Sequence, residues 1–370
     1  MNRIEIKPKL SSFREISKYI KKIDTNRYYS NFGPLYQYTA KKISKDYGLK
    51  KNSLILTSSG HSSLLSCCLY LKKFTRKKYI LVPSFNFYSA PQAILQSGYE
   101  PYFVDIEKKD FTINYDKIEK AFHKLKNNIA GIIAVSPFGY PLNIDKLNNI
   151  QKKFKTKVIY DAADTFINFD NNLDHSELLI CCSFHPTKTL PSNESGLIIC
   201  PNKDLQIIKN ITSFGCNGRN KEIVIDGFNG KFSEYDAAIF LANYIKRDKI
   251  KKKLFKNIKY LNKKLNLLQK KDVSLMPNFG ESWVSTKISC ISKKQTFKSL
   301  KNKFSKLGIE IYSGWNNKPM HMHSFFKKCK KANLKITNSI FNKFFIIPMN
   351  IDISKKDMDL ILLALKKIFK

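Results

Sequence analysis

The chain has 370 residues and a formal net charge of +37, and 43% of its residues are hydrophobic. This length exceeds one ordinary hydrophobic core, so we expect a large domain with a smaller one attached. The hydrophobic content is that of a folded soluble protein. No apolar run approaches the roughly 20 residues that cross a bilayer, so no membrane span is predicted.

The positive charge raises the question of nucleic-acid binding. Only six of the 66 basic residues are arginine, the side chain that reads base edges and clamps phosphates through two hydrogen bonds. The lysines are scattered over positions that we expect to face solvent, a pattern typical of A+T-rich codon usage. We therefore predict no specific nucleic-acid partner, while non-specific attraction to polyanions or to a membrane surface stays open.

The eight cysteines include two adjacent pairs and no Cys-x-x-Cys motif. The first nine residues show no signal-peptide pattern. We expect buried thiols in a reducing compartment, so the predicted location is cytoplasmic. His321 and His323 have no other ligand types near them in the sequence, and no metal site is predicted.

A helix is expected over 36–45, after a turn at Gly33-Pro34. From Leu54 to about residue 200, short apolar runs alternate with amphipathic helices, which predicts a mainly parallel sheet with both faces covered. The predicted strands are 54–57, 79–82, 102–106, 129–135, 158–160, 178–182 and 197–200. The predicted helices between them are 64–73, 88–96, 115–125 and 144–154.

The pattern changes after about residue 202. Helices are predicted over 205–213 and, as one long helix, over 234–268. A strand near 283–292, a helix over 297–306, strands near 309–312 and 344–348, and a terminal helix capped by Ser354 follow. This α+β tail places the predicted domain boundary inside the long helix, with a large domain over 1–248 and a small domain over 249–370.

Lys188 stands out because it lies in a nearly uncharged run, Cys181 to Gly196, between two predicted buried strands. Connections of this kind often carry function. A desolvated lysine has a lowered pKa and can act as an amine nucleophile. The alternative is a surface-loop lysine in a lysine-rich protein, and this stretch alone does not decide between the two.

Three further stretches follow predicted strands, where open α/β sheets bind ligands. The turn Ser58 to Ser63 leads into a helix whose first amides can bind a phosphate, although a plain strand–helix turn is the simpler interpretation. Phe87 can stack on a planar ring or pack in the core. Asp161 follows a buried strand and either needs a cationic or donor partner or caps the next turn.

Together these stretches predict a pyridoxal phosphate site. The lysine amine forms an imine with the cofactor's aldehyde, and the carboxylate keeps the pyridinium nitrogen protonated. The helix start holds the phosphate, and the aromatic ring stacks on the cofactor. The combination is far more specific than any one of its parts.

At this point the sequence resembles the DegT/DnrJ/EryC1/StrS family of sugar aminotransferases, from about Asn31 to the C-terminus. The matching segments are Asn31-Phe-Gly-Pro-Leu35, Val82-Pro-Ser-Phe-Asn-Phe87, Asp161-Ala-Ala, Ser183-Phe-His-Pro-Thr-Lys188, Glu194-Ser-Gly196, Gly227 to Glu234, Asp236-Ala-Ala238, Pro319 to His321 and Phe344 to Pro348. The resemblance implies an aspartate-aminotransferase-like α/β fold. Its large domain would hold a seven-stranded, mixed, mainly parallel sheet between helices, beside the smaller C-terminal α+β domain.

The resemblance also implies site residues. The implied catalytic residues are Lys188, Asp161 and His185. The implied cofactor-binding residues are Gly60, His61, Ser62, Phe87, Asp161, Asp164, Ser183, Lys188 and Asn229. Asn229 would reach the phosphate in a neighbouring subunit's site, so the working unit would be a homodimer.

Three positions depart from the family's pattern. Asp164 stands where Gln is common near the cofactor's phenolic oxygen, and two anions at about 3–4 Å repel by roughly 4 kcal/mol at an intermediate dielectric. Asp164 would therefore turn away, be protonated, or tune the site differently. His61 replaces the usual Thr, and Ser136 stands where His is frequent.

The resemblance implies a transaminase that moves an amino group from an amino acid, usually glutamate, to a nucleotide-linked keto-sugar. Such a reaction makes amino sugars for a surface polysaccharide or a related glycan. Two alternatives stay open. One is other pyridoxal phosphate chemistry on this fold, such as sugar dehydration, although the family's dehydratases carry His in place of the lysine. The other is a non-catalytic regulatory homologue.

Overall fold

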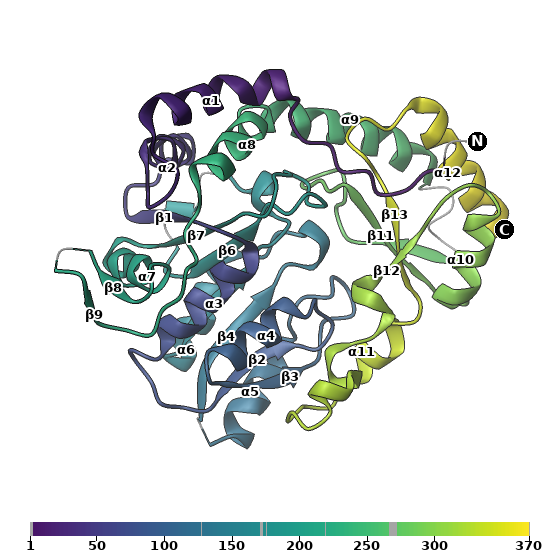
Figure 1. Ribbon diagram of the computed structural model, residues 1–370. Coiled ribbons are helices and arrows are strands. Elements are labelled where there is room, and N and C mark those ends of the chain that lie inside the picture. The colour runs from purple at the N-terminus through teal and green to yellow at the C-terminus, as the bar shows by residue number, and fades with distance from the viewer. Residues whose placement is uncertain are drawn as a thin grey trace.

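The computed structural model describes residues 3–369 apart from 127, 171, 172, 175, 219 and 266–271 (Figure 1). Two sheets organise these residues, a seven-stranded sheet and a four-stranded sheet. The strands of the larger sheet are β1 (Asn52–Thr57), β2 (Tyr79–Pro83), β3 (Glu100–Val104), β4 (Ile129–Val135), β5 (Lys157–Asp161), β6 (Leu179–Ser183) and β7 (Gly196–Pro201).

The larger sheet has the order β1-β7-β6-β5-β4-β2-β3, and only β7 runs against the other six strands. This confirms the predicted seven-stranded, mixed, mainly parallel sheet. Its strands are almost entirely buried because helices cover both faces, which explains their continuous apolar runs. All seven predicted strands are present, within two residues of their predicted ends.

Alternate residues of each strand belong to two separate cores. Ile159 faces the core under α3, α4 and α7, whereas Val158 and Tyr160 face the core under α2, α5, α6 and α8. The helices of the first core are α3 (Gly60–Leu71), α4 (Ser89–Gln96) and α7 (Leu205–Ile211). Those of the second are α2 (Pro34–Asp46), α5 (Tyr115–Lys124), α6 (Ile144–Phe154) and α8 (Glu234–Tyr244).

The smaller sheet is antiparallel throughout, in the order β10-β11-β13-β12. Its strands are β10 (Val273–Leu275), β11 (Lys287–Ser292), β12 (Tyr312–Ser313) and β13 (Phe344–Pro348), and its neighbouring helices are α10 (Phe297–Ser305), α11 (Lys335–Ile340) and α12 (Lys355–Ile368). Ser354 caps α12 as predicted, because its hydroxyl accepts from the Asp357 amide at 3.1 Å. The predicted strand over 309–312 is wrong in its bounds, since Ile309 pairs with Ile4 instead.

The N-terminal segment lies beside the smaller sheet and then runs across to α1 (Phe13–Asn26), which packs on the larger unit (Figure 1). Ile4 forms a parallel bridge with Ile309. The Ile4 amide donates to the Gly308 carbonyl at 2.9 Å, and the Glu310 amide donates to the Ile4 carbonyl at 2.8 Å. Residues far apart in the chain therefore close the smaller unit.

The long helix predicted over 234–268 is two helices, α8 and α9 (Arg247–Leu265), so that prediction is wrong; residues 266–268 lie outside the described residues. The Lys246 amide bonds to the carbonyl of Asn243, three residues back, which tightens the last turn of α8. The apolar pattern runs on through this break, so the sequence does not reveal it. The predicted boundary at 248/249 falls in the first turn of α9 and remains a prediction.

A two-stranded hairpin, β8 (Cys216–Asn217) with β9 (Glu222–Ile223), extends from the edge of the larger unit in Figure 1 and was not predicted. Across the described residues, no helix combines the length and apolarity that a bilayer crossing requires.

Candidate active site

The predicted site residues lie at one edge of the larger sheet. Because β1, β2, β5 and β6 are parallel, their carboxyl ends meet at this edge. Ser183, at the end of β6, pairs with Gly196, which pairs in turn with Thr57 at the end of β1. The sheet therefore brings the turn after β1 beside the loop that carries Lys188.

The turn after β1 enters α3 at Gly60, as predicted. Ser59 caps the helix, because its hydroxyl accepts from the Ser62 amide at 3.0 Å. A Cβ on Gly60 would lie 2.5 Å from the Cβ of Ser183, so only glycine allows this approach. Among the described residues, the Gly60 and His61 amides have no hydrogen-bond acceptor, and the first turn of α3 holds no acidic side chain. This helix start can bind an anion.

The His61 side chain turns to α4. Its ring nitrogens are hydrogen-bonded to Ser89 Oγ at 3.0 Å and to Gln96 Oε1 at 2.9 Å. The ring is therefore engaged on the protein surface, and the contribution His61 can make to an anion site is its backbone amide.

Phe87 follows β2 and is 40% exposed, with its ring centroid 3.8 Å from that of Tyr88. The core-packing alternative for Phe87 is wrong, because Phe85 fills the core in this stretch instead. An exposed ring at the ligand-binding edge can stack on a planar ligand.

Asp161 ends β5 and is buried. Its Oδ1 accepts from the Ala163 amide at 3.2 Å, so it also caps the following turn. Burial raises the pKa of Asp161 to about 6, against the opposing effect of the Lys188 charge. A cationic ring nitrogen is the kind of partner that would hold this carboxylate in its charged form.

Lys188 is partly exposed in the loop between β6 and β7, and its amine has no ion pair or hydrogen bond with any described residue. Burial lowers the pKa of Lys188, and the positive charge of Lys287 adds to this effect, while Asp164, Asp161 and Glu194 oppose it. An amine with a lowered pKa is a better nucleophile near neutral pH.

Asp164 is buried, and its partner is a residue that the sequence did not single out. Lys287 Nζ lies 2.6 Å from Asp164 Oδ2, and the Thr189 amide donates to Asp164 Oδ1 at 2.7 Å. Burial alone would raise the pKa of Asp164, but Lys287 and then Lys188 outweigh it and hold that pKa below its usual value. Asp164 is therefore a charged carboxylate that is paired with Lys287. The sequence did not point to Lys287, because nothing distinguishes it there from the many other lysines of the chain.

The remaining predicted residues lie farther from these contacts or are engaged locally. His185 is hydrogen-bonded to Thr187 Oγ1 at 2.9 Å, and its Nε2 lies 3.4 Å from Glu194 Oε1. Ser136 is hydrogen-bonded to Thr165 and to the carbonyl of Tyr140. Asn229 is exposed and forms a bridge with Ser213, while the carbonyl of the next residue, Gly230, accepts from the Ser58 amide after β1 at 3.0 Å.

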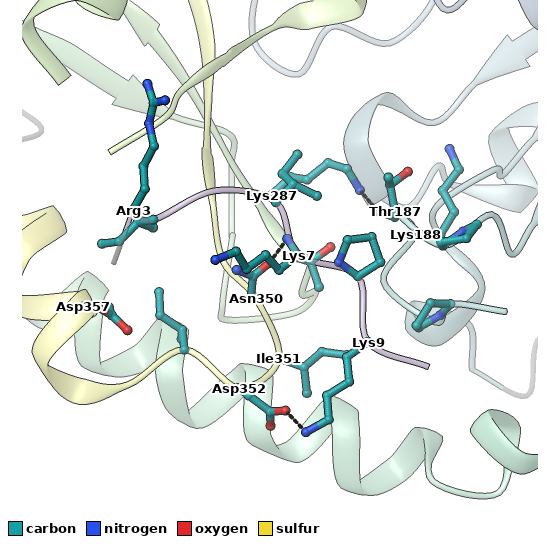
Figure 2. Close-up of a pocket in the computed structure, with 17 residues that line it drawn as sticks. Arg3, Lys7, Lys9, Thr187, Lys188, Lys287, Asn350, Ile351, Asp352 and Asp357 are labelled. Atoms are coloured by element: carbon teal, nitrogen blue, oxygen red, sulfur yellow. Dashed lines mark hydrogen bonds and ion pairs between the residues drawn. The ribbon is translucent and has the colours of Figure 1, made fainter. Parts of the chain in front are cut away.

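A cavity of about 400 Å³ reaches the Lys188 loop from the side of the smaller sheet (Figure 2). It is lined by residues of the N-terminal segment, of the 186–191 loop and of the stretch after β13. Its basic lining residues are Arg3, Lys7, Lys9, Lys188 and Lys287. Figure 2 shows the Lys188 amine pointing away from the N-terminal segment.

Residues 12–366 match the DegT/DnrJ/EryC1/StrS aminotransferase family. The chain belongs to this family. The aminotransferase is 25% identical over 367 residues to dTDP-4-amino-4,6-dideoxy-D-glucose transaminase of Escherichia coli, covering 94% of each protein. It is 29% identical over 238 residues to the Shigella dysenteriae transaminase of the same name, covering 63% of this chain and 62% of that enzyme, less than two thirds of its length.

A solved structure from Bacillus cereus, provisionally named a PLP-dependent aminotransferase, superposes with a TM-score of 0.89 at 26% identity. The superposition covers 99% of this chain and 100% of that one. The matches confirm the predicted family, fold and dependence on pyridoxal phosphate.

The residues of this aminotransferase fit that cofactor. The close approach of Gly60 brings Ser183 beside helix-start amides that have no acceptor among the described residues, which suits a phosphate. The buried Asp161 carboxylate has no cation in hydrogen-bond contact among the described residues, and the Lys188 amine is likewise unpaired. A pyridinium and an aldehyde are the groups that would satisfy them.

Proposed function

We propose that this enzyme moves an amino group from an amino acid, with glutamate as the first candidate, to a keto group of a nucleotide-linked sugar. The observation that carries the proposal is the unpaired amine of Lys188 near the buried carboxylate of Asp161 at the ligand-binding edge of the sheet. The names of the E. coli and S. dysenteriae relatives support a nucleotide-sugar acceptor.

Each group at the strand ends then has a role. Bound pyridoxal phosphate supplies an electron-accepting ring and carries the amino group between the two substrates. Lys188 Nζ binds the cofactor and moves a proton at the amino-bearing carbon of each substrate, as general base and then acid. Asp161 keeps the ring nitrogen protonated. Phe87 stacks on the ring, and Ser183 with the helix start at Gly60, His61 and Ser62 holds the phosphate.

The charge of the cavity beside the Lys188 loop supports anionic substrates. Five basic side chains line it against the two carboxylates of Asp352 and Asp357, although Lys7, Lys9 and Lys287 are each paired with a carboxylate of the chain. A dicarboxylic amino acid and a sugar diphosphonucleoside both carry negative charge that such a lining attracts.

The test is a two-stage assay with the purified holoenzyme. Glutamate alone should release 2-oxoglutarate in an amount close to that of the enzyme. A panel of dTDP- and UDP-linked 4-keto and 3-keto sugars should then yield an amino sugar, seen by mass spectrometry, with continuous 2-oxoglutarate release. Lys188→Ala should do neither.

Two outcomes would contradict the proposal. Failure of the first stage with every common amino acid would remove the transaminase role of the site. Success of the first stage without any sugar product would leave the amino donor in place and refute the nucleotide-sugar acceptor. Loss of a sugar hydroxyl without an amino-sugar product would instead favour the dehydratase-like alternative.

We also propose that the enzyme works as a homodimer with shared sites, in which Asn229 reaches the phosphate in the site of the second copy. Exposed apolar side chains near the β8–β9 hairpin and at the start of α8 support an interface there. They are Phe214, Ile223, Val224 and Tyr235. All eight cysteines are free thiols, which suits a cytoplasmic enzyme. The amino sugar that the enzyme makes would enter a surface polysaccharide or a related glycan.

A further inference from the structure

Lys287 is the first residue of β11, in the smaller sheet, yet its side chain ends beside the Lys188 loop of the larger unit. Its Nζ donates to Asp164 Oδ2 at 2.6 Å and to the carbonyl oxygen of Thr187 at 2.7 Å. The Lys287 side chain is 12% exposed and that of Asp164 is 6% exposed. Buried charges in such positions require a partner of opposite sign.

The two charges hold the peptide groups on both sides of Lys188. Lys287 binds the carbonyl of Thr187, the residue before it, and Asp164 accepts from the amide of Thr189, the residue after it, at 2.7 Å. The direction of the Lys188 backbone is thus set by one ion pair rather than by the loop alone.

Backbone and hydroxyl contacts tie the same place to β11. The Thr286 amide donates to Thr189 Oγ1 at 3.4 Å, and Thr189 Oγ1 donates to Ser285 Oγ at 3.5 Å. The Lys188 loop is therefore hydrogen-bonded to the stretch that leads into β11 as well as to Lys287.

We propose that Lys287 is a positioning residue of the active site: paired with Asp164, it clamps the peptide groups before and after Lys188 and cancels the charge that Asp164 brings beside the reactive amine. This proposal rests on Lys188 as the cofactor-bearing amine. It does not depend on which sugar the enzyme aminates, so a wrong acceptor would leave it untouched.

The charged groups that face the Lys188 amine come from four places: Asp161 at the end of β5, Asp164 in the next turn, Lys287 from β11 and Glu194 before β7. Asp164 favours the ammonium form of Lys188, and Lys287 opposes it. The two charges act in opposite directions, so loss of Asp164 should lower the Lys188 pKa and loss of Lys287 should raise it.

A set of four full-length proteins tests the clamp: wild type, Lys287→Met, Asp164→Asn and the double variant. The titration of Lys188 is measured in the cofactor-free chain by trace acetylation with acetic anhydride across pH, followed by peptide mass spectrometry. Relative to wild type, Lys287→Met should raise the Lys188 pKa and Asp164→Asn should lower it, each by about one pH unit. The double variant should return close to wild type.

A second readout reports the clamp itself. Hydrogen exchange of the Thr187–Leu190 segment should speed up about tenfold or more in Lys287→Met, because the loop loses the bond that anchors the Thr187 carbonyl and the amides of Lys188 and Thr189 should then open more often. Lys287→Arg, which keeps a charged donor, should restore part of the protection. Lys294→Met is the matched control, since it breaks an exposed ion pair with Asp272 at 2.9 Å and should change neither readout.

Shifts of the Lys188 titration in the same direction in both single variants, or no shift in either, would overturn the proposal. A double variant that is less stable than both single variants would overturn it as well, because the two charges would then not compensate each other. Single variants that fail to fold while the double variant folds would support the compensation.

Discussion

Asp161 and Lys188 lie at the same edge of the larger sheet, and their surroundings shift both pKa values so that the neutral forms are favoured. Burial raises the pKa of Asp161 to about 6 and lowers that of Lys188. Each group thus has a larger neutral fraction near neutral pH than it would in water, and each lacks a hydrogen-bonded ion partner among the described residues. Groups perturbed in this way mark functional sites more often than structural ones.

Asp161 should make the cofactor-free protein less stable as the pH rises. The folded-state pKa of about 6 exceeds the unfolded value of 3.8, so the penalty is absent below about pH 4 and develops as the pH rises through 6. The full penalty is about 3 kcal/mol. In urea titrations, Asp161→Asn should therefore gain stability relative to wild type between pH 4 and pH 7. An unchanged difference across this range would show that a protein group already pairs with the carboxylate.

Lys188 should be the residue that binds the cofactor covalently. Borohydride treatment of the holoenzyme should add the mass of the reduced cofactor to the Lys188 peptide, and Lys188→Ala should lose both this adduct and the visible absorption band. Lys251 is a suitable control because burial also lowers its pKa, although it lies on α9. A retained adduct in Lys188→Ala, or a loss in Lys251→Ala, would assign the role to another amine.

Single residues were predictable where the sequence context was unusual. Lys188 stood alone in an uncharged run, and Asp161 and Gly60 followed strands that apolar runs made visible. Lys287 begins an apolar strand as many lysines in this chain could, and its importance depends on Asp164, which is 123 positions away. A contact of this kind becomes visible only when the two sheets are placed together.

At the level of elements, the first amides of α2 are capped by a carboxylate from another helix. Its N-cap is Gly33, which has no side chain to offer. The buried Glu234, the first residue of α8, accepts instead from the Leu35 amide at 2.7 Å and the Tyr36 amide at 2.8 Å. A Cβ on Gly33 would lie 2.7 Å from Glu234 Cδ, so the glycine is what admits the carboxylate.

Removal of this carboxylate should destabilise the protein. Glu234→Ala leaves two buried amides without acceptors, and we expect a loss of about 2–4 kcal/mol in the free energy of unfolding. Glu234→Gln keeps one acceptor and should lose less. Glu222→Ala is the control, because Glu222 is exposed on β9 and should change stability by less than about 0.5 kcal/mol. Equal effects of the two alanine variants in urea unfolding would contradict the capping role.

Helices and strands were predictable where the hydrophobic residues follow a single clear pattern along the sequence. Each of the seven strands of the larger sheet contains a short apolar run, and the predicted bounds were close. The break between α8 and α9 was hidden because α8 is apolar on most sides and α9 continues with apolar positions among its lysines. The two-residue strands β8, β9 and β12 are too short to show a period.

For the whole molecule, an aromatic cluster joins the two sheets. Phe138, after β4, stacks on Trp315 with ring centroids 4.2 Å apart and on Phe344 of β13 at 4.8 Å. Phe85, after β2, meets Trp315 edge-on at 4.7 Å. The rings come from both sheets, so the relative position of the sheets is set by packing beside the active site. The change of pattern after residue 202 led to the prediction of a second, smaller domain, but nothing in the sequence predicted this contact.

Mixed dimers should test whether sites are shared between copies. Lys188→Ala and Asn229→Ala should each be nearly inactive. If Asn229 serves the partner's site, then mixing the two after dissociation gives heterodimers with one intact site, and about a quarter of wild-type activity should return. Mixing Lys188→Ala with Asp161→Asn is the control, because both changes affect the chain's own site and no activity should return. Recovery in both mixtures, or in neither, would contradict shared sites.

The bridge between Ile4 and Ile309 has a consequence for biosynthesis. Ile4 leaves the ribosome 305 residues before its partner Ile309. At roughly 5–20 residues per second, this segment waits about 15–60 s for the strand that completes it. The larger sheet can form in the meantime, because β1 to β7 end by Pro201. The segment around Ile4 is therefore translated before the larger sheet but is expected to join the fold only after the chain around Ile309 has been made.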